Sequence, residues 1–174
     1  MPAEAEKRLH RCCFSGQGPN KLKTPGEEVD AWFEQQIDAA IADGYSTFLC
    51  GCGMGADLDA GMAVLRKRDA GAPVKLICVV PWPGFARKWD YVWQAPYEYL
   101  LNHADYVKMI SDTFHDKVFR ERNEYLVNHS RRLIAWYEDG ASRTWDTIEY
   151  AVLQGIEVVT NKPEFVEAFR AELK

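Results

Sequence analysis

The chain has 174 residues, of which 47% are hydrophobic and 27% charged, and its formal net charge is -5. That length buries the core of one domain without disulfides, and the composition excludes a largely disordered chain. The acidic balance excludes a general attraction to polyanions, so we do not expect a nucleic acid as the partner.

The first half of the chain alternates strand and helix signals. Thr24, Pro25 and Glu27 have the arrangement of a capping box, which predicts the start of a helix. The apolar run over residues 74–80 is typical of a central parallel strand. The predicted elements are strands over residues 9–14, 45–50 and 74–80 and helices over residues 25–43 and 56–67.

The second half repeats this alternation. Pro96 would break a continuous helix but suits the first turn of a new one, so we predict two helical pieces, over residues 85–95 and 96–103. Asn161, Pro163 and Glu164 predict the start of the last helix. The other predicted elements are strands over residues 106–110, 133–137 and 156–160 and helices over residues 116–129 and 144–154.

The alternation predicts both the fold and the place of the ligand site. We expect a single α/β domain over residues 1–174, a three-layer Rossmann-like sandwich with a mostly parallel sheet of about six strands. The pattern leaves the strand order open. In such folds ligands bind beyond the carboxyl ends of the strands, where the strand order reverses. The loops at that edge are residues 15–22, 50–57, 81–89, 111–116 and 138–144.

Two of these loops are candidate anion sites. The segment Cys50–Asp57 has glycines at alternate positions, which let backbone N–H groups approach a phosphate, and a helix follows it. It has neither Walker A nor dinucleotide-binding spacing, and the alternative is a tight turn that packs helix on strand. The later loop has donors on Ser142, Arg143 and Thr144. Thr144 can instead serve only as the N-cap of the next helix.

Further side chains can reach a ligand, and each has a structural alternative. Asp57 can hydrogen-bond a ribose hydroxyl or the loop after the first strand, or merely cap its helix. Asn123 can reach the ligand or tie down a loop, and Arg122 can pair with a phosphate or with an acidic neighbour. Three tryptophans can stack on a base or belong to the core, namely Trp82, Trp89 and Trp93.

The amino-terminal segment and the cysteines indicate a cytoplasmic protein. The apolar stretch near the amino terminus is too short and too polar for a signal peptide or a membrane span. The odd number of cysteines, in strand-like surroundings, is typical of reduced, buried thiols. A weaker alternative is a zinc site formed by Cys12, Cys13, Cys50, Cys52 and the nearby His10. Neither cysteine spacing is a strong zinc pattern, so we expect no metal.

Seven segments occur in an order that is far more specific than any single glycine loop. They are CCFSGQGPNKL (12–22), CGCGMGADLDA (50–60), residues 81–89, ADYV (104–107), FRERNEYLVNHS (119–130), LIAWYEDG (133–140) and TWDTIEYA (144–151). In these segments the chain resembles the YpsA-type proteins of the SLOG superfamily, whose relatives include LOG-type phosphoribohydrolases and the DNA-processing protein DprA. The resemblance implies a Rossmann-like fold and a pocket for a nucleotide, an NAD derivative or an ADP-ribose-like ligand.

The chain departs from the family pattern at positions that bear on catalysis. Where the family has a His-Arg pair, this chain has Gln17 and Gly18, and where the family has a glutamate it has Met62. A Gly-Gly pair is replaced by Ser142 and Arg143, and an acidic residue by Arg131 or Arg132. A LOG-type hydrolase needs an arginine and a carboxylate at the glycosidic bond. The candidates here are Arg143 or Arg122 with Asp146. These departures count against catalysis more than against binding.

We therefore expect a protein that binds, senses or sequesters a nucleotide-derived small molecule, requires no other cofactor and is without catalysis. One alternative is a nucleoside monophosphate phosphoribohydrolase, with Asp146 and Arg143 as catalytic candidates. Another is single-stranded DNA binding as in DprA, through Arg120, Arg122, Arg131 and Arg132. A homo-oligomer is left open. The predicted ligand-binding residues are Ser15, Gly16, Gln17, Gly51, Gly53, Met54, Gly55, Asp57, Pro81, Trp82, Trp89, Arg122, Asn123, Gly140, Ser142, Arg143 and Thr144.

Overall fold

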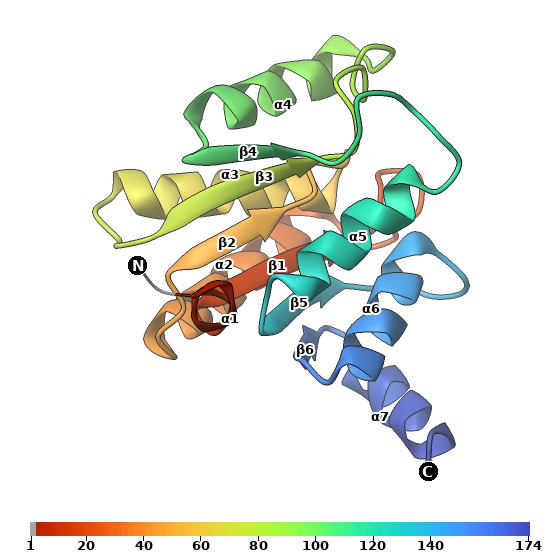
Figure 1. The fold of residues 1–174 in the computed structure, drawn as a ribbon. Coiled ribbons are helices and arrows are strands. Elements are labelled where there is room, and N and C mark those ends of the chain that lie inside the picture. The colour runs from red at the N-terminus through yellow and green to blue at the C-terminus, as the bar shows by residue number, and fades with distance from the viewer. Residues whose placement is uncertain (1–2) are drawn as a thin grey trace.

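Strands and helices alternate along the chain in the computed structural model, which describes residues 3–174 (Figure 1). The strands are β1 (Arg11–Gly16), β2 (Thr47–Cys50), β3 (Lys75–Val80), β4 (Tyr106–Met109), β5 (Arg132–Trp136) and β6 (Glu157–Thr160). The helices are α1 (Glu4–Arg8), α2 (Gly26–Ala42), α3 (Ala56–Asp69), α4 (Tyr91–His103), α5 (Val118–Asn128), α6 (Arg143–Gln154) and α7 (Pro163–Glu172). All the predicted strands are confirmed, whereas α1 was not predicted. Within the described residues, no helix combines the length and apolarity needed to cross a bilayer.

The strands form one six-stranded sheet in the order β4-β3-β2-β1-β5-β6. Every neighbouring pair is parallel, which confirms the α/β fold class and makes the sheet parallel throughout. The chain steps outward from β1 to β4 and then crosses back to place β5 beside β1. The strand order therefore reverses between β1 and β5, where a fold of this type is expected to hold its ligand.

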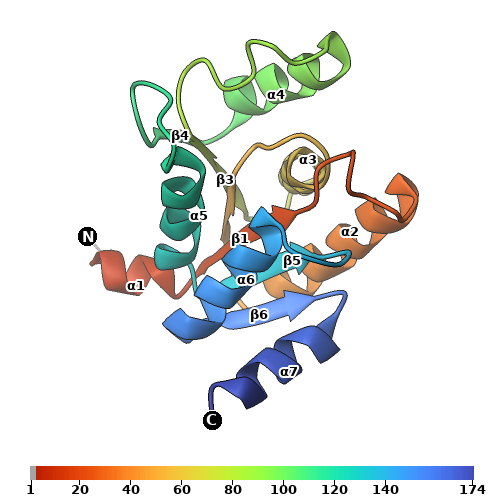
Figure 2. The same ribbon diagram turned by 90° about the vertical axis from the view of Figure 1, so that its right-hand side faces the viewer.

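Helices cover both faces of the sheet and make the predicted three-layer Rossmann-like sandwich. Figure 2 shows α2, α3 and α4 on one face and α5 and α6 on the other. Successive strand residues point to opposite faces, so Cys12 and Phe14 belong to the core beneath α2 and α3, whereas Cys13 belongs to the core beneath α5 and α6. On the first face, Phe14 stacks on Phe48 with ring centroids 5.7 Å apart.

The cysteines do not gather into the zinc site that the sequence left open. All five are buried and free. Cys12 and Cys13 are adjacent in β1 and lie in different cores, so the two thiols point away from one another across the sheet. No group of three or more histidine, cysteine or acidic side chains in residues 3–174 is arranged to hold a metal ion.

Helix α4 corrects the prediction of two helical pieces. It runs from Tyr91 to His103 with Pro96 inside it, and residues 85–89 form turns instead of a helix. Proline removes the donor that would bond the carbonyl four residues earlier, which belongs to Val92. Val92 is 68% exposed, so water can hydrate the freed carbonyl, and the helix continues through the proline.

Two predicted capping motifs have other partners in the fold. The N-cap of α2 is Pro25 and makes no side-chain capping bond. The Thr24 N–H and hydroxyl instead donate to the Glu138 carboxylate, at 3.3 and 3.5 Å. Asn161 does not cap α7 but accepts from the Tyr137 N–H at 2.7 Å. In both cases a partner distant in the sequence replaces the local hydrogen bond.

Candidate functional site

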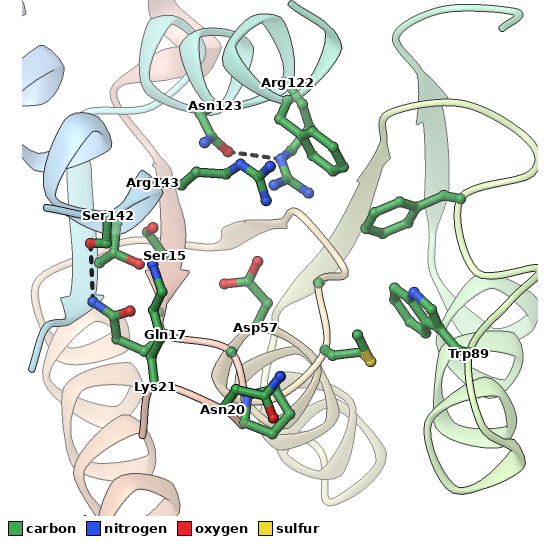
Figure 3. Close-up of a pocket in the computed structure, with 18 residues that line it drawn as sticks. Ser15, Gln17, Asn20, Lys21, Asp57, Trp89, Arg122, Asn123, Ser142 and Arg143 are labelled. Carbon is green, nitrogen blue, oxygen red and sulfur yellow. Dashed lines mark hydrogen bonds between the residues drawn. The ribbon is translucent and has the colours of Figure 1, made fainter. Parts of the chain in front are cut away.

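A pocket of about 360 Å³ lies at the carboxyl end of β1, between the amino-terminal ends of α3 and α6 (Figure 3). It is therefore at the edge of the sheet where the strand order reverses. The predicted residues that line it are Ser15, Gly16, Gln17, Gly53, Met54, Asp57, Trp89, Arg122, Asn123, Ser142, Arg143 and Thr144. The tertiary structure thus brings together side chains from loops that are more than a hundred residues apart.

The loop after β1 forms one wall and joins the two helix ends. A Cβ atom at Gly16 would lie 2.4 Å from the Cβ of Ala56, so only a residue without a side chain lets β1 approach α3 this closely. Gln17 is buried, and its carbonyl accepts from the Ala56 N–H at 3.4 Å. Its side-chain amide donates to the Ser142 hydroxyl at 3.1 Å. Gln17 therefore links the start of α3 to the start of α6.

The glycine-rich loop after β2 contributes its middle to the pocket and its ends to the scaffold. Gly53 and Met54 line the pocket. The Gly51 carbonyl accepts from Arg122 instead, and Gly55 caps α3 with a φ of 88°, a conformation that side chains disfavour. A Cβ atom at Gly55 would also lie 3.0 Å from the Gln17 carbonyl oxygen. Gly51 and Gly55 therefore shape the loop without facing the pocket.

The amino-terminal end of α6 supplies polar groups from a third loop. Ser142 is the N-cap, since its hydroxyl accepts from the Trp145 N–H at 3.1 Å. The alternative in which Thr144 serves as the N-cap is therefore wrong. Thr144 is buried and lines the pocket from the first turn, where unpaired backbone N–H groups favour an anion. Gly140 turns the preceding loop, with a φ of 70°, and lies outside the pocket.

Asp57 rises from the first turn of α3 into the middle of the pocket (Figure 3). Its side chain does not cap the helix, and the residue is only 8% exposed. Burial raises the pKa of the carboxyl to about 6, although Arg122 and the backbone N–H groups of Gly53 and Gly16 act in the opposite direction. The Oδ1 atom has no hydrogen-bond partner among residues 3–174.

Two arginines face Asp57 from across the pocket (Figure 3). Arg122 is buried and donates to the Gly51 carbonyl at 2.6 Å and to the Asn123 side-chain oxygen at 2.7 Å. Burial lowers the pKa of this guanidinium, while the charge of Asp57 raises it. Arg143 lies 4.1 Å from the ring centroid of Phe119, the geometry of a cation–π contact. Arg122 is thus held by the scaffold, whereas Arg143 is at the pocket entrance.

An aromatic wall completes the pocket on the side of β3. Phe85, Trp89 and Phe119 line it, with the rings of Phe85 and Trp89 4.9 Å apart. Trp82 lies outside it, edge-on to Phe85 and Phe119 at 5.4 and 5.6 Å. Trp93 and Pro81 do not line the pocket either. Trp93 packs against the core, and the Pro81 carbonyl accepts from the Ser111 N–H. Of the predicted tryptophans, Trp89 alone faces this pocket.

The catalytic candidate Asp146 does not line this pocket. It lines a separate groove of about 510 Å³ between α5 and α6. Arg143, Asn123 and Phe119 border both the groove and the pocket. Arg143 and Asp146, candidates for a hydrolase, thus share the groove, whereas Asp57 is the carboxylate that lines the pocket.

Several lining residues were absent from the predicted set. They are Gly18, Pro19, Asn20, Lys21, Phe85 and Phe119. The first four belong to the loop over residues 15–22, which was predicted to lie at the ligand edge, so the position of the loop was the available signal. Lys21 places a cation in the same pocket-lining loop as Gln17 and Gly18. Phe119 follows the helical spacing of a core residue, and nothing local distinguishes it from one.

Comparison with known proteins gives the family. The YpsA family model, described as the YspA SLOG family, matches residues 23–157. A UPF0398 protein of Halalkalibacterium halodurans is 29% identical over 109 residues, which cover 62% of this chain and 58% of that protein. A UPF0398 protein of Staphylococcus aureus is 23% identical over 110 residues, covering 62% and 59%. The match thus spans less than two thirds of the length of these relatives.

A solved structure supports the same fold. DNA processing protein A from Helicobacter pylori, described for its single-stranded DNA binding mode, superposes with a TM-score of 0.62. The match covers 90% of this chain and 66% of that one at 14% identity, which shows likeness of fold alone. The resemblance drawn from the seven ordered segments is confirmed, because the family model covers most of the chain. The chain belongs to the YspA SLOG family.

Proposed function

We propose that this protein binds, senses or sequesters a nucleotide-derived small molecule, of the NAD-derived or ADP-ribose-like class, in the pocket at the ends of β1, α3 and α6. One observation carries the proposal. Arg143 and the amino terminus of α6 border one side of the pocket, and Trp89 lies on the other side (Figure 3). A nucleotide has a phosphate and a base on the same sugar, so its site needs cationic groups for the phosphate and an aromatic surface for the base.

Charge favours an anion at the α6 side. Lys21 and Arg143 are exposed and line the entrance, so both can contact a bound phosphate directly. Arg122 also lines the pocket; its Nε and Nη1 atoms donate to Asn123 and Gly51, and its guanidinium retains further N–H donors. Charge-assisted hydrogen bonds are the stronger ones, and the first turn of α6 adds backbone donors. The cationic groups outnumber the single lining carboxylate among the described residues.

The aromatic wall suits a nucleobase. Phe85 and Trp89 line the pocket, whereas Arg143 lies over the ring of Phe119. Stacking on aromatic rings is tolerant of base identity, because every base has a π face. The pocket volume of about 360 Å³ is within the range of small-molecule sites.

Binding without turnover is favoured over the phosphoribohydrolase alternative. An N-glycosidase requires a carboxylate beside the glycosidic bond, together with groups that manage the leaving base. Asp146 lines the separate groove, and Asp57 is the carboxylate of the pocket. The proposal therefore assigns binding to the pocket and no catalytic role to Asp146.

Calorimetry with AMP, ADP-ribose and NAD tests the proposal. We expect at least one to bind, and Arg143→Ala to weaken that binding about tenfold or more, because it removes a charge-assisted contact. Thr144→Val should weaken binding as well, whereas Arg131→Ala, an exposed arginine away from the pocket, should not.

Two results would contradict the proposal. Failure of all three compounds to bind the wild-type protein would remove the binding function. Chromatography that detects free base released from AMP at high protein concentration would show that the protein hydrolyses the nucleotide, and the proposal of binding without turnover would be wrong.

A further inference from the structure

The most unusual polar atom of the pocket is Asp57 Oδ1. It is buried without a hydrogen-bond partner among residues 3–174, and Asp57 as a whole is 8% exposed. Figure 3 shows the carboxylate pointing from α3 into the space that a ligand would fill. A buried acceptor that lacks a partner is costly, so this atom requires a donor when the pocket is occupied.

The surroundings define which donor fits. Arg122 on α5 and Arg143 at the start of α6 face Asp57 from the far side, and Lys21 lines the pocket from the loop after β1. The pKa of the buried Cys13 thiol on β1 is raised by burial and, to a smaller extent, by the charge of Asp57. Arg122 already donates to Gly51 and Asn123. A phosphate in contact with Oδ1 would oppose two negative charges at short distance, which disfavours that placement.

We propose that Asp57 holds the sugar of the ligand: its Oδ1 atom accepts a hydrogen bond from a ribose hydroxyl, and the phosphate lies away from it, near Arg143 and Lys21. This inference rests on the proposed function and orients the ligand within the same pocket. The glycine loop beside Asp57 then gives the sugar room to approach α3. The phosphate then lies at the start of α6 and not at the glycine loop.

A pair of nucleotides that differ only in the sugar tests the orientation. AMP and 2′,3′-dideoxy-AMP share the base and the phosphate, so the ratio of their affinities isolates the hydroxyl contacts. We expect AMP to bind the wild-type protein about tenfold or more tightly at pH 7.5, since a hydrogen bond to a charged acceptor is lost in the dideoxy compound. Calorimetry measures both constants.

The pH dependence of that ratio tests the acceptor. Asp57, with a pKa of about 6, is mostly ionised at pH 7.5 and largely protonated at pH 5. The AMP to dideoxy-AMP ratio should therefore fall several-fold between these pH values. Titration of the shared phosphate and of other pocket groups affects both nucleotides and cancels in the ratio.

Asp57→Asn is the matched variant. The amide oxygen can still accept from the backbone N–H groups of Gly53 and Gly16, which leaves an N–H donor pointing into the pocket. We expect the ratio to approach one and to lose its pH dependence, with dideoxy-AMP bound at least as tightly as before. Thermal unfolding checks that the variant folds. If the variant does not fold, the affinity ratio of the wild-type protein and its pH dependence still test whether Asp57 contacts the sugar.

The outcomes separate the two claims. Equal binding of AMP and dideoxy-AMP by the wild-type protein overturns the role of Asp57 but preserves a nucleotide site. A ratio that rises as the pH falls also overturns it, because a protonated Asp57 would then be the better partner. Binding of neither nucleotide, nor of ADP-ribose or NAD, overturns the proposed function itself.

Discussion

At the scale of single residues, the shape of the site depends on the buried guanidinium of Arg122. Arg122 holds the glycine loop through the Gly51 carbonyl and is the cation beside Asp57. A buried guanidinium must have its hydrogen bonds satisfied, and a buried carboxylate must have compensation. Arg122 meets both requirements and places Asn123 at the pocket.

Removal of this guanidinium should destabilise the protein. We expect Arg122→Ala to lower the free energy of unfolding by about 3 kcal/mol, because Gly51 loses its donor and Asp57 loses its neighbouring cation. Urea unfolding measures the change. Arg131→Ala, at an exposed arginine, should change the same quantity by less than about 0.5 kcal/mol. Equal effects of the two substitutions would contradict a structural role for Arg122.

At the scale of elements, the approach of β1 to α3 creates the floor of the pocket. The approach is possible because Gly16 has no side chain against Ala56. Gly16→Ala should cost about 1–3 kcal/mol of unfolding free energy, as overpacking does, and should weaken ligand binding by moving the loop that follows. Chemical denaturation and calorimetry provide the two readouts.

Gly26→Ala is the matched control for this substitution. A Cβ atom there meets nothing within 4 Å, and the residue begins α2. We expect it to be neutral or slightly stabilising, since alanine has the higher helix propensity. A Gly16→Ala protein as stable as Gly26→Ala would show that β1 and α3 are less tightly packed than the distances indicate.

The contact between α2 and α3 contains a pair of carboxyl groups. Burial, and then the charge and hydrogen bond of Asp30, raise the pKa of Asp59 to about 6. A raised carboxyl pKa means that the folded state binds the proton more tightly than the unfolded state does. The free energy of unfolding should therefore fall as the pH rises from about 4 to 6, by roughly 1–2 kcal/mol from this pair.

Asp59→Asn tests this pH dependence. The variant lacks the titrating group, so its stability relative to wild type should increase between pH 4 and pH 7. Urea midpoints at several pH values measure the difference. Carboxyl groups whose pKa is lowered, such as Glu34 and Asp105, act in the opposite direction at lower pH and are present in both proteins. A pH-independent difference would argue against a raised pKa of Asp59 in the folded state.

At the scale of the whole molecule, the arginines that suggested DNA binding do not form one surface. Arg122 is buried, and Arg132 is buried between Asp43 and Glu157 at 2.7 and 2.9 Å. Arg120 pairs with Glu124, while Arg131 precedes the amino-terminal end of β5, at the opposite edge of the sheet from the pocket. The net charge of -5 also disfavours general association with a polyanion.

We therefore expect no complex with single-stranded DNA, even at low salt, where phosphate contacts are strongest. A mobility-shift assay with an unstructured oligonucleotide measures this, and a strongly basic protein serves as the positive control. A shifted band that disappears as the salt concentration rises would contradict the expectation and would revive the DNA-binding alternative.

Much of the fold could be predicted from the sequence because its signals are local. The apolar run of β3 and the end of α6 at residue 154 depend on neighbouring residues, and both predictions hold. The failures have a common cause. Thr24 and Asn161 hydrogen-bond to distant groups, and Pro96 lies in α4 one turn after Val92, whose exposure no residue of the local pattern determines. A local pattern contains no information about such partners.

For the candidate site, the sequence by itself determined which loops meet at the ligand edge and which residue types they carry, because parallel strands send their carboxyl ends to one side. Only the tertiary structure decided which of those residues share a pocket. It brought Lys21 and Phe119 in, placed Asp146 in another groove and buried Asp57 with one oxygen that has no partner among residues 3–174. These outcomes depend on the strand order and the packing of helices, which are set by contacts between residues far apart in the chain.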